Sequence, residues 1–267
     1  MFKNIKPLSS SKGFTLIELL LSMVFGLIVL SGVIYVYLAV IVSSSETLKS
    51  TKLNTQLMTM MSIMVNDVRR AGFWGNPDAL PSADNPFNVD NDTLLTIFSN
   101  ATASVDENTN TDGYCLLFSY DKNGDGSVDA AGDVEYFGFR FSRSDGTVEM
   151  AVNSAQVPAI TCSGGTWFPL SDPDLIEITS LTFNPAESAC VNSSEPDGFD
   201  SASDADSTVD DVGEKDCYTV APTAGHITVE TREILITLTG RLKSDSEVTA
   251  KIKQTVRVRN DVVRVRA

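Results

Sequence analysis

Histidine is nearly absent from this chain of 267 residues, in which His226 is the single example. One imidazole cannot build a histidine-based zinc site, and it argues against a Ser-His-Asp catalytic arrangement. The GxGxxG, P-loop and GxSxG motifs are absent as well. The sequence therefore lacks the signatures of dinucleotide-dependent, phosphate-binding and serine-hydrolase enzymes, and we expect a protein without catalytic residues.

Basic residues are also few: 20 Lys and Arg stand against 35 Asp and Glu, which gives a formal net charge of −15. Three lysines lie within residues 1–13, which contain no acid, so the remainder of the chain is more acidic still. Proteins bind nucleic acid through clustered Lys and Arg. We therefore expect no nucleic-acid partner held by a broad basic face.

The four cysteines are widely spaced and form no CxxC pair. In an extracytoplasmic domain they predict two disulfides, whereas in the cytoplasm they would be ordinary buried thiols. Three pairings exist, and the sequence leaves all three open. In one of them Cys190 pairs with Cys217, at the two ends of an acidic stretch, and Cys115 pairs with Cys162.

A long apolar run is the main feature of the N-terminal part. Residues 14–42 form 29 consecutive positions whose one charge is Glu18, whereas roughly 20 apolar residues suffice for a membrane-spanning helix. The lysines before the run place its N-terminus in the cytoplasm and residues after about 43 outside it. A carboxylate inside a membrane helix is costly unless it is paired, so Glu18 is a candidate functional residue.

Residues 12–20, KGFTLIELL, resemble the leader junction of type IV prepilins and related pseudopilins. The resemblance implies that residues 1–13 are a leader, cleaved between Gly13 and Phe14 by a prepilin peptidase. The same enzyme would then methylate the new amino group of Phe14. A neighbouring subunit's Glu18 would neutralise this amine and set the register between subunits, because each buried charge is tolerable only as part of a pair.

The helix is predicted to continue through residues 43–71, because Leu53, Leu57, Met64 and Val68 recur at helical spacing and no proline or glycine occurs before Gly72. We expect this half to pack on a globular domain. Gly72 can adopt the left-handed conformation that ends a helix.

The residues around this helix end carry a second resemblance. Residues 67–75, DVRRAGFWG, are similar to an element of PilW-type minor pilins that covers Asp67, Arg69, Gly72 and Phe73. Phe73 and Trp74 are expected to anchor the chain as it enters the domain. Residues 255–260, TVRVRN, also look like that family.

Residues 72–267 are expected to form an extracytoplasmic, β-rich domain. Apolar or alternating runs separated by turn residues predict strands at residues 114–120, 134–141, 175–183, 227–239 and 248–258. We expect them to form a mainly antiparallel sheet packed on the helix. The predicted fold class is therefore α+β, the type IV pilin fold.

Residues 186–217 interrupt the strand pattern. Between Cys190 and Cys217 the sequence contains nine acidic residues and only Lys215 as a base. Such a composition cannot bury a core, so we expect a surface loop. Its role stays open between a solvated charge run, a recognition surface and a further calcium-binding patch.

Residues 121–129, DKNGDGSVD, predict a calcium-binding loop. Oxygen-bearing side chains stand at Asp121, Asn123, Asp125 and Asp129, with a carbonyl available from Ser127, as in loops of the EF-hand and dockerin type, which the segment resembles. Gly126 takes the turn position of such loops. At the twelfth position Gly132 stands in place of the usual acid, and Asp133 follows one residue late. A polar turn between two strands is the alternative interpretation.

These features together predict a structural subunit of a filament. We expect a minor pilin in the inner membrane of a Gram-negative-type bacterium, later in a surface pilus that serves motility, adhesion or DNA uptake. The resemblance implies as partners the prepilin peptidase, the inner-membrane assembly platform, the major pilin, other minor pilins and a tip adhesin. The alternative is a J-type pseudopilin of a type II secretion system, which shares the leader and the helix.

Overall fold

The computed structural model describes residues 13–75, 85–89, 93–100, 103–106, 109–128, 134–154, 162–163, 166–194 and 216–266. The chain divides into two compact units, residues 1–49 and residues 50–267. Helix α1, Leu16–Val68, contributes residues to both units and is 53 residues long. The expected helix is thus present, ending three residues before the predicted limit in a turn at residues 69–72.

In the second unit, one side of α1 is buried because its apolar residues recur every three or four positions. The buried residues are Leu53, Leu57, Met60, Met61, Met64, Val65 and Val68. Each side chain of this kind contributes about 1.5–3 kcal/mol on burial. Gly240 permits the close approach of a strand here, because a Cβ at this position would lie 3.2 Å from Cδ2 of Leu57.

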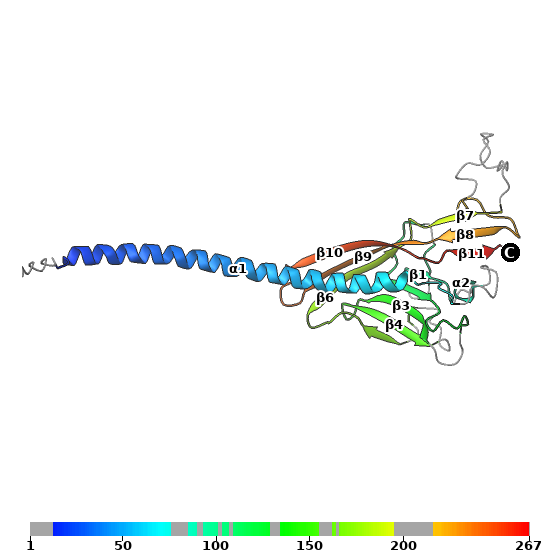
Figure 1. Ribbon diagram of the computed structural model, residues 1–267, viewed down its shortest axis with the longest axis horizontal. Coiled ribbons are helices and arrows are strands. Elements are labelled where there is room, and N and C mark those ends of the chain that lie inside the picture. The colour runs from blue at the N-terminus through cyan, green and yellow to red at the C-terminus, as the bar shows by residue number, and fades with distance from the viewer. Residues whose placement is uncertain are drawn as a thin grey trace, which may run out of the picture. The chain divides into compact units, whose positions relative to one another are not determined.

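Three antiparallel sheets complete the second unit (Figure 1). Sheet A has the order β1-β2-β3-β4-β5, in which neighbouring strands follow each other along the chain. Its strands are β1 (Thr96–Phe98), β2 (Cys115–Ser119), β3 (Val134–Ser142), β4 (Thr147–Ser154) and β5 (Trp167–Pro169). Phe118 stacks against Phe137 and Phe139 of β3, which gives this sheet an aromatic core.

Sheet B has the order β10-β9-β6. Its strands are β6 (Ile176–Asn184), β9 (Glu233–Leu242) and β10 (Thr249–Arg257). Alternate residues of β9 are buried, among them Ile234, Ile236 and Leu238, and they join the core formed by α1 and sheet A. The alternation follows from the period of two in a strand with one face on the core.

Sheet C has the order β11-β8-β7. Its strands are β7 (Ala189–Asn192), β8 (Ile227–Thr231) and β11 (Val262–Val265). The prediction of one strand over residues 227–239 was wrong, because the chain passes from sheet C to sheet B at Arg232. The backbone of Arg232 instead accepts a hydrogen bond from the N–H of Val258, and its guanidinium donates to the carbonyl of Leu95.

The α+β, pilin-like fold class is confirmed, but its sheet is divided into three. Six elements were not predicted: helix α2 (Pro86–Val89) and strands β1, β4, β5, β7 and β11. Most are short and have no clear sequence period, whereas β4 has eight residues and alternates at Val148, Met150 and Val152. The expected loop over residues 186–217 contains β7, which pairs with β8. Residues 195–215 of that stretch lie outside the described residues.

Two disulfides link the second unit, Cys115–Cys162 and Cys190–Cys217. They correspond to one of the three pairings that the sequence left open. The guanidinium of Arg140 donates to the carbonyl of Cys162 at 2.6 Å and lies 4.3 Å from the ring centre of Trp167. Arg140 of β3 therefore links the Cys162 end of the first disulfide to sheet A by a hydrogen bond, and its cation–π contact with Trp167 of β5 holds the guanidinium in position.

Candidate functional site

The leader junction lies at the start of α1. Gly13 and Phe14 are described and exposed, while residues 1–12 of the predicted leader lie outside the described residues. The carboxylate of Glu18 accepts hydrogen bonds from the backbone N–H and the hydroxyl of Thr15, at 3.0 and 2.9 Å. The N–H of Glu18 donates back to the Thr15 hydroxyl at 3.3 Å. This reciprocal pair is a capping box, which explains why the helix begins at Leu16.

Helix α1 is long and apolar enough to cross a membrane, judged by its length and composition. The large apolar side chains from Phe14 to Val42 are all strongly exposed in the single chain. Such a surface is stable in lipid or against other apolar helices. The first part of α1 is therefore a candidate membrane anchor.

The helix end is closed from three sides. Gly72 has φ of 69°, the left-handed conformation expected for it, and its N–H donates to the carbonyl of Ser119 at 2.8 Å. A Cβ at Gly72 would lie 2.3 Å from Oδ1 of Asn88, so the position requires glycine. The side chain of Asn260 donates to the carbonyl of Ala71 at 3.0 Å. This bond pairs a carbonyl of the turn that follows the helix.

Only one of the two aromatic residues after the helix is an anchor. Trp74 is buried, and its indole N–H donates to the carbonyl of Gly126 at 2.8 Å. Phe73 is 45 % exposed, so the expectation that its ring fixes the chain was wrong. Its backbone carbonyl accepts from the N–H of Asp121 at 2.9 Å, which ties the helix end to the predicted calcium loop.

Within the helix-end element, Asp67 is half buried and Arg69 contributes a backbone carbonyl. Desolvation raises the pKa of Asp67, and the nearby charges of Arg70 and Lys122 partly oppose this effect. The Arg69 carbonyl accepts from the N–H of Arg259 at 3.2 Å. The two segments that resemble PilW-type pilins, the helix end and residues 255–260, therefore lie in contact.

The predicted calcium loop joins β2 to β3, two neighbouring antiparallel strands, as expected. Asp121 is buried and organises the turn. Its carboxylate accepts from the N–H groups of Gly75, Gly124 and Gly126, at 2.9, 2.6 and 2.9 Å. Two of these bonds come from within the loop, where Gly124 and Gly126 both adopt positive φ and bend the backbone around the Asp121 carboxylate.

The remaining loop residues hold Asp125 at the surface. The Asp125 carboxylate accepts from the amide of Asn123 at 2.8 Å and from the N–H of Ser127 at 2.8 Å. Asp129 and Asp133, the other two predicted ligands, lie outside the described residues. The structure therefore brings together four of the six predicted residues in one turn.

A further carboxylate, Glu135, was missed by the sequence reasoning. Oxygen atoms of Asp121, Asp125 and Glu135 all lie within 4.8 Å of one another, and Glu135 is fully buried. Calcium loops of the EF-hand type take an acid late in the motif. In this chain a buried acid stands at the start of β3, and the signal that could have identified it is a glutamate at the second residue of a strand whose first half is otherwise apolar.

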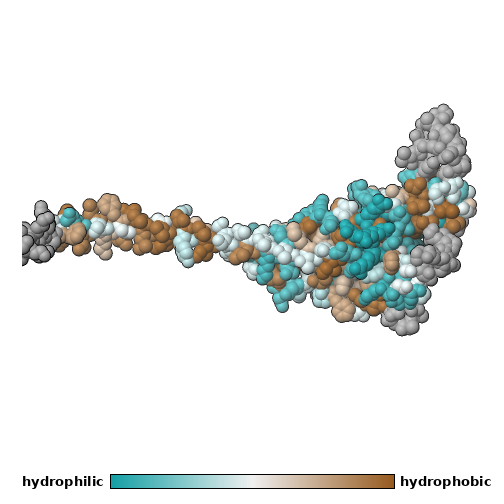
Figure 2. All heavy atoms as spheres, viewed as in Figure 1, coloured by the Kyte–Doolittle hydropathy of each residue, from teal (hydrophilic) through white to brown (hydrophobic). Residues whose placement is uncertain are grey.

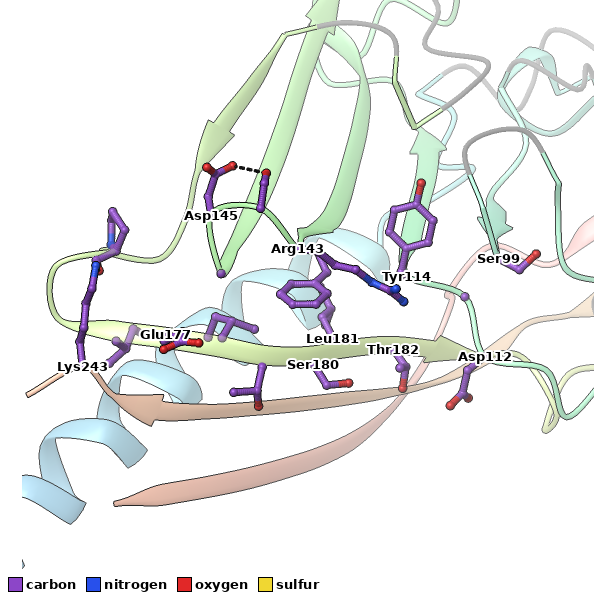
Figure 3. A pocket seen from close by; sticks show the side chains of 18 residues that line it. Ser99, Asp112, Tyr114, Arg143, Asp145, Glu177, Ser180, Leu181, Thr182 and Lys243 are labelled. Atoms are coloured by element: carbon purple, nitrogen blue, oxygen red, sulfur yellow. Dashed lines mark hydrogen bonds between the residues drawn. The ribbon is translucent and has the colours of Figure 1, made fainter. Parts of the chain in front are cut away.

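A separate groove of about 710 Å³ lies along β6 and the turn between β3 and β4. Figure 3 shows Glu177 and Lys243 at one end and Asp112 and Tyr114 at the other. Glu177 is paired with Arg241 at 2.8 Å, which lowers the Glu177 pKa through a hydrogen bond and charge. The groove contains none of the predicted site residues, and its lining includes no cysteine or histidine.

Comparison with known proteins gives one match. The model of a family described as prepilin peptidase-dependent protein B matches residues 46–258. No curated protein and no solved structure matches the chain. The matched region includes the helix end, the loop after Asp121 and sheets A and B, and it ends before β11. Because it covers most of the sequence, this chain belongs to the prepilin peptidase-dependent protein B family.

Proposed function

We propose that the protein is a minor pilin of the PilW kind, which primes assembly of a type IV pilus and enters the filament near its tip. The observation that carries the proposal is α1 itself. One continuous helix begins with the exposed apolar surface of residues 14–42 and ends with a face buried in the β-rich unit. Membership in a prepilin-related family and the PilW-like residues around Gly72 support the same conclusion.

The partners follow from this proposal. The prepilin peptidase would cut between Gly13 and Phe14 and methylate Phe14, and the inner membrane would hold the subunit until assembly. The assembly platform, the major pilin and other minor pilins, and a tip adhesin, would then contact it. Two disulfides fit a domain outside the cytoplasm, since disulfides persist in oxidising compartments.

Deletion of the gene tests the proposal. Sparse or absent surface pili with normal protein secretion are expected, scored by electron microscopy and by enzyme activity in the medium. Normal pili with blocked secretion would instead identify a J-type pseudopilin. Complementation with the wild-type gene is the control for both readouts.

Glu18 is proposed to set the register by pairing with the amine of Phe14 in a neighbouring subunit. Glu18→Ala should be processed at Gly13 but recovered with sheared filaments at a small fraction of the wild-type level. Because Glu18 also caps α1, Thr15→Ala serves as the matched variant that removes the capping hydroxyl and keeps the carboxylate. Glu46→Ala, farther along the same helix, controls for loss of charge. Normal incorporation of Glu18→Ala would contradict the proposed register.

We also propose that the loop after Asp121 binds calcium and stiffens the helix end. The supporting observation is the convergence of the buried Glu135 on Asp121 and Asp125, since like carboxylates at this spacing are stabilised by a divalent cation. Asn123 is a further oxygen donor in the same turn, and Ser127 can offer its carbonyl. Asp129 and Asp133 follow within the same segment of the sequence.

Calorimetry and thermal unfolding test calcium binding on the full chain in detergent. Calcium at a hundredfold excess over its Kd should stabilise the protein by about 2.7 kcal/mol. Asp125→Asn and Glu135→Gln should abolish both the heat and the shift in melting temperature. Asp145→Asn, in the polar turn between β3 and β4, is the matched control. Equal calcium responses in all variants would overturn the site.

A further inference from the structure

Sheet C has its polarity reversed relative to sheets A and B. In an antiparallel pair, directly opposed residues lie on the same face. The register places Val191 of β7 opposite Val229 of β8, and Val263 of β11 opposite the same Val229. It also pairs Ile227 with Val265. One face of sheet C is therefore built from these aliphatic residues, together with Ala189 and, opposite it, Thr231.

This aliphatic face is the one turned to solvent. Val191 is 48 %, Ile227 41 % and Val265 57 % exposed, whereas Val229 and Val263 are partly covered by their neighbours. Figure 2 shows hydrophobic surface over the strands of sheet C, next to atoms drawn in grey. We call this set the sheet C patch: Ala189, Val191, Ile227, Val229, Val263 and Val265.

The opposite face of sheet C is buried and mostly polar, although it also carries Cys190 and Val262, which are buried as well. Asn192, Thr228 and Glu230 are almost inaccessible to solvent. Glu230 Oε1 lies 2.9 Å from Nη2 of Arg266, and its Oε2 lies 3.5 Å from Nη2 of Arg264. Burying ion pairs while exposing valines costs stability, so the arrangement is unfavourable for a subunit that functions alone.

The size of the sheet C patch and the net charge of the chain restrict which partner can cover the patch. An exposed patch of a few hundred Å² marks an interaction site, yet a stable two-protein interface buries about 800 Å² on each partner. The six side chains of the patch can bury less area than such an interface requires. The contact therefore requires a partner that is also held nearby by a second attachment, because such an attachment raises the partner's effective concentration. Two copies of this chain, each with a net charge of −15, repel one another.

We propose that the sheet C patch binds an apolar surface of a second, different prepilin-type subunit anchored in the same membrane. The inference rests on the proposed filament function, since that function supplies the shared anchor. The inference adds to the proposed function the face of the domain that contacts the partner. The partner surface is uncharged at its centre, because a charge buried there without a counter-ion would cost several kcal/mol.

Photo-crosslinking in cells tests the contact on the full chain. Benzoylphenylalanine replaces Val191 or Val265 in two variants, and Thr255 in a control variant on the exposed face of β10. After illumination, adducts are identified by mass spectrometry. We expect both patch positions to link to one other protein that carries a prepilin leader, at a yield at least about tenfold above that from Thr255, since a tenfold difference in affinity needs only 1.4 kcal/mol.

A charge variant tests the chemistry of the same contact. With the crosslinker at Ile227, Val191→Glu/Val265→Glu should lower the adduct yield at least about tenfold, because carboxylates on the patch must be desolvated. Thr255→Glu is the matched control and should leave the yield unchanged. Formation of the Cys190–Cys217 disulfide and protease resistance report that sheet C is intact in each variant.

In the crosslinking experiment, the absence of an adduct at both patch positions would overturn the inference. So would adducts with a second copy of the chain, with residues 195–215 of the same chain, or with a protein that lacks a leader. In the second experiment, an adduct yield in the charge variant equal to that of the unsubstituted patch would overturn it as well. Failure of the proposed function is distinguishable. If deletion leaves pili unchanged while the adduct with another leader-bearing subunit forms, the pilus assignment is wrong and the patch assignment holds.

Discussion

Replacement of Glu230 by glutamine probes the buried side of sheet C. Glu230 is 2 % exposed, and its carboxylate contacts three guanidinium groups, those of Arg232, Arg264 and Arg266. Arg232 is itself 3 % exposed. The variant keeps the shape of the side chain but removes the negative charge, so cationic groups remain buried without this counter-charge. We expect the protein to lose about 3–5 kcal/mol of stability, the usual cost of removing one partner of a buried pair.

Denaturant unfolding followed by tryptophan fluorescence measures this loss. Both tryptophans, Trp74 and Trp167, belong to the second unit, so the signal reports the β-rich unit when the full chain is studied in detergent. A loss of this size lowers the melting temperature by about 6–20 °C. Glu177→Gln, which removes the carboxylate of the exposed pair with Arg241, is the matched control and should change stability little. If Glu230→Gln changes the free energy of unfolding no more than Glu177→Gln does, the ion pairs of Glu230 on the buried face of sheet C do not stabilise the protein, and the reasoning is refuted.

Two further predictions concern the end of α1. Because burial raises the pKa of Asp67 above its value in the unfolded chain, the folded state binds this proton more tightly and stability should rise as pH falls through the folded pKa. Asp67→Asn should therefore be more stable than the wild type at neutral pH, and the difference in the free energy of unfolding should vanish below the ordinary aspartate pKa. Urea unfolding measures this free energy, and a difference that stays constant between about pH 3 and 8 would contradict the prediction. Gly72→Ala should cost at least about 1–2 kcal/mol from the left-handed backbone, plus the displacement of Asn88. Gly124→Ala, also at positive φ but with open space around it, isolates the backbone cost, and equal losses in both variants would show that Asn88 yields freely.

The helix and the principal strands could be predicted because each has a strong period of its own. Leu53, Leu57 and Met64 recur at helical spacing, and alternation marks β9 over Ile234, Ile236 and Leu238. The break at Arg232 was missed, although four consecutive polar residues, 230–233, interrupt the apolar pattern between β8 and β9. What divides the run is a tertiary contact, the hydrogen bond from Arg232 to the carbonyl of Leu95, 137 positions away in the sequence.

The candidate sites also contain features that depend on local sequence and features that depend on tertiary contacts. Gly72 and the turn after Asp121 are local in sequence, so the positive φ values and the hydrogen-bonded turn were foreseeable from glycine and aspartate spacing. Glu135 escaped because it is a strand residue whose role depends on how β3 pairs with β2. Phe73 and Trp74 are both aromatic neighbours, and nothing in their types reveals that the indole N–H of Trp74 reaches Gly126 while Phe73 faces solvent.

The closed end of α1 has a mechanical consequence. A filament under tension would deliver load to each subunit through its helix. At this end, Gly72 is bonded to Ser119, Trp74 to Gly126 and Ala71 to Asn260, so the load divides over three segments at the same time. Bonds loaded in parallel share the force, whereas bonds loaded in series break one after another. In the proposed filament, the turn that follows α1 would thus act as a force-bearing joint, and Asn260 would make the segment after β10 part of it.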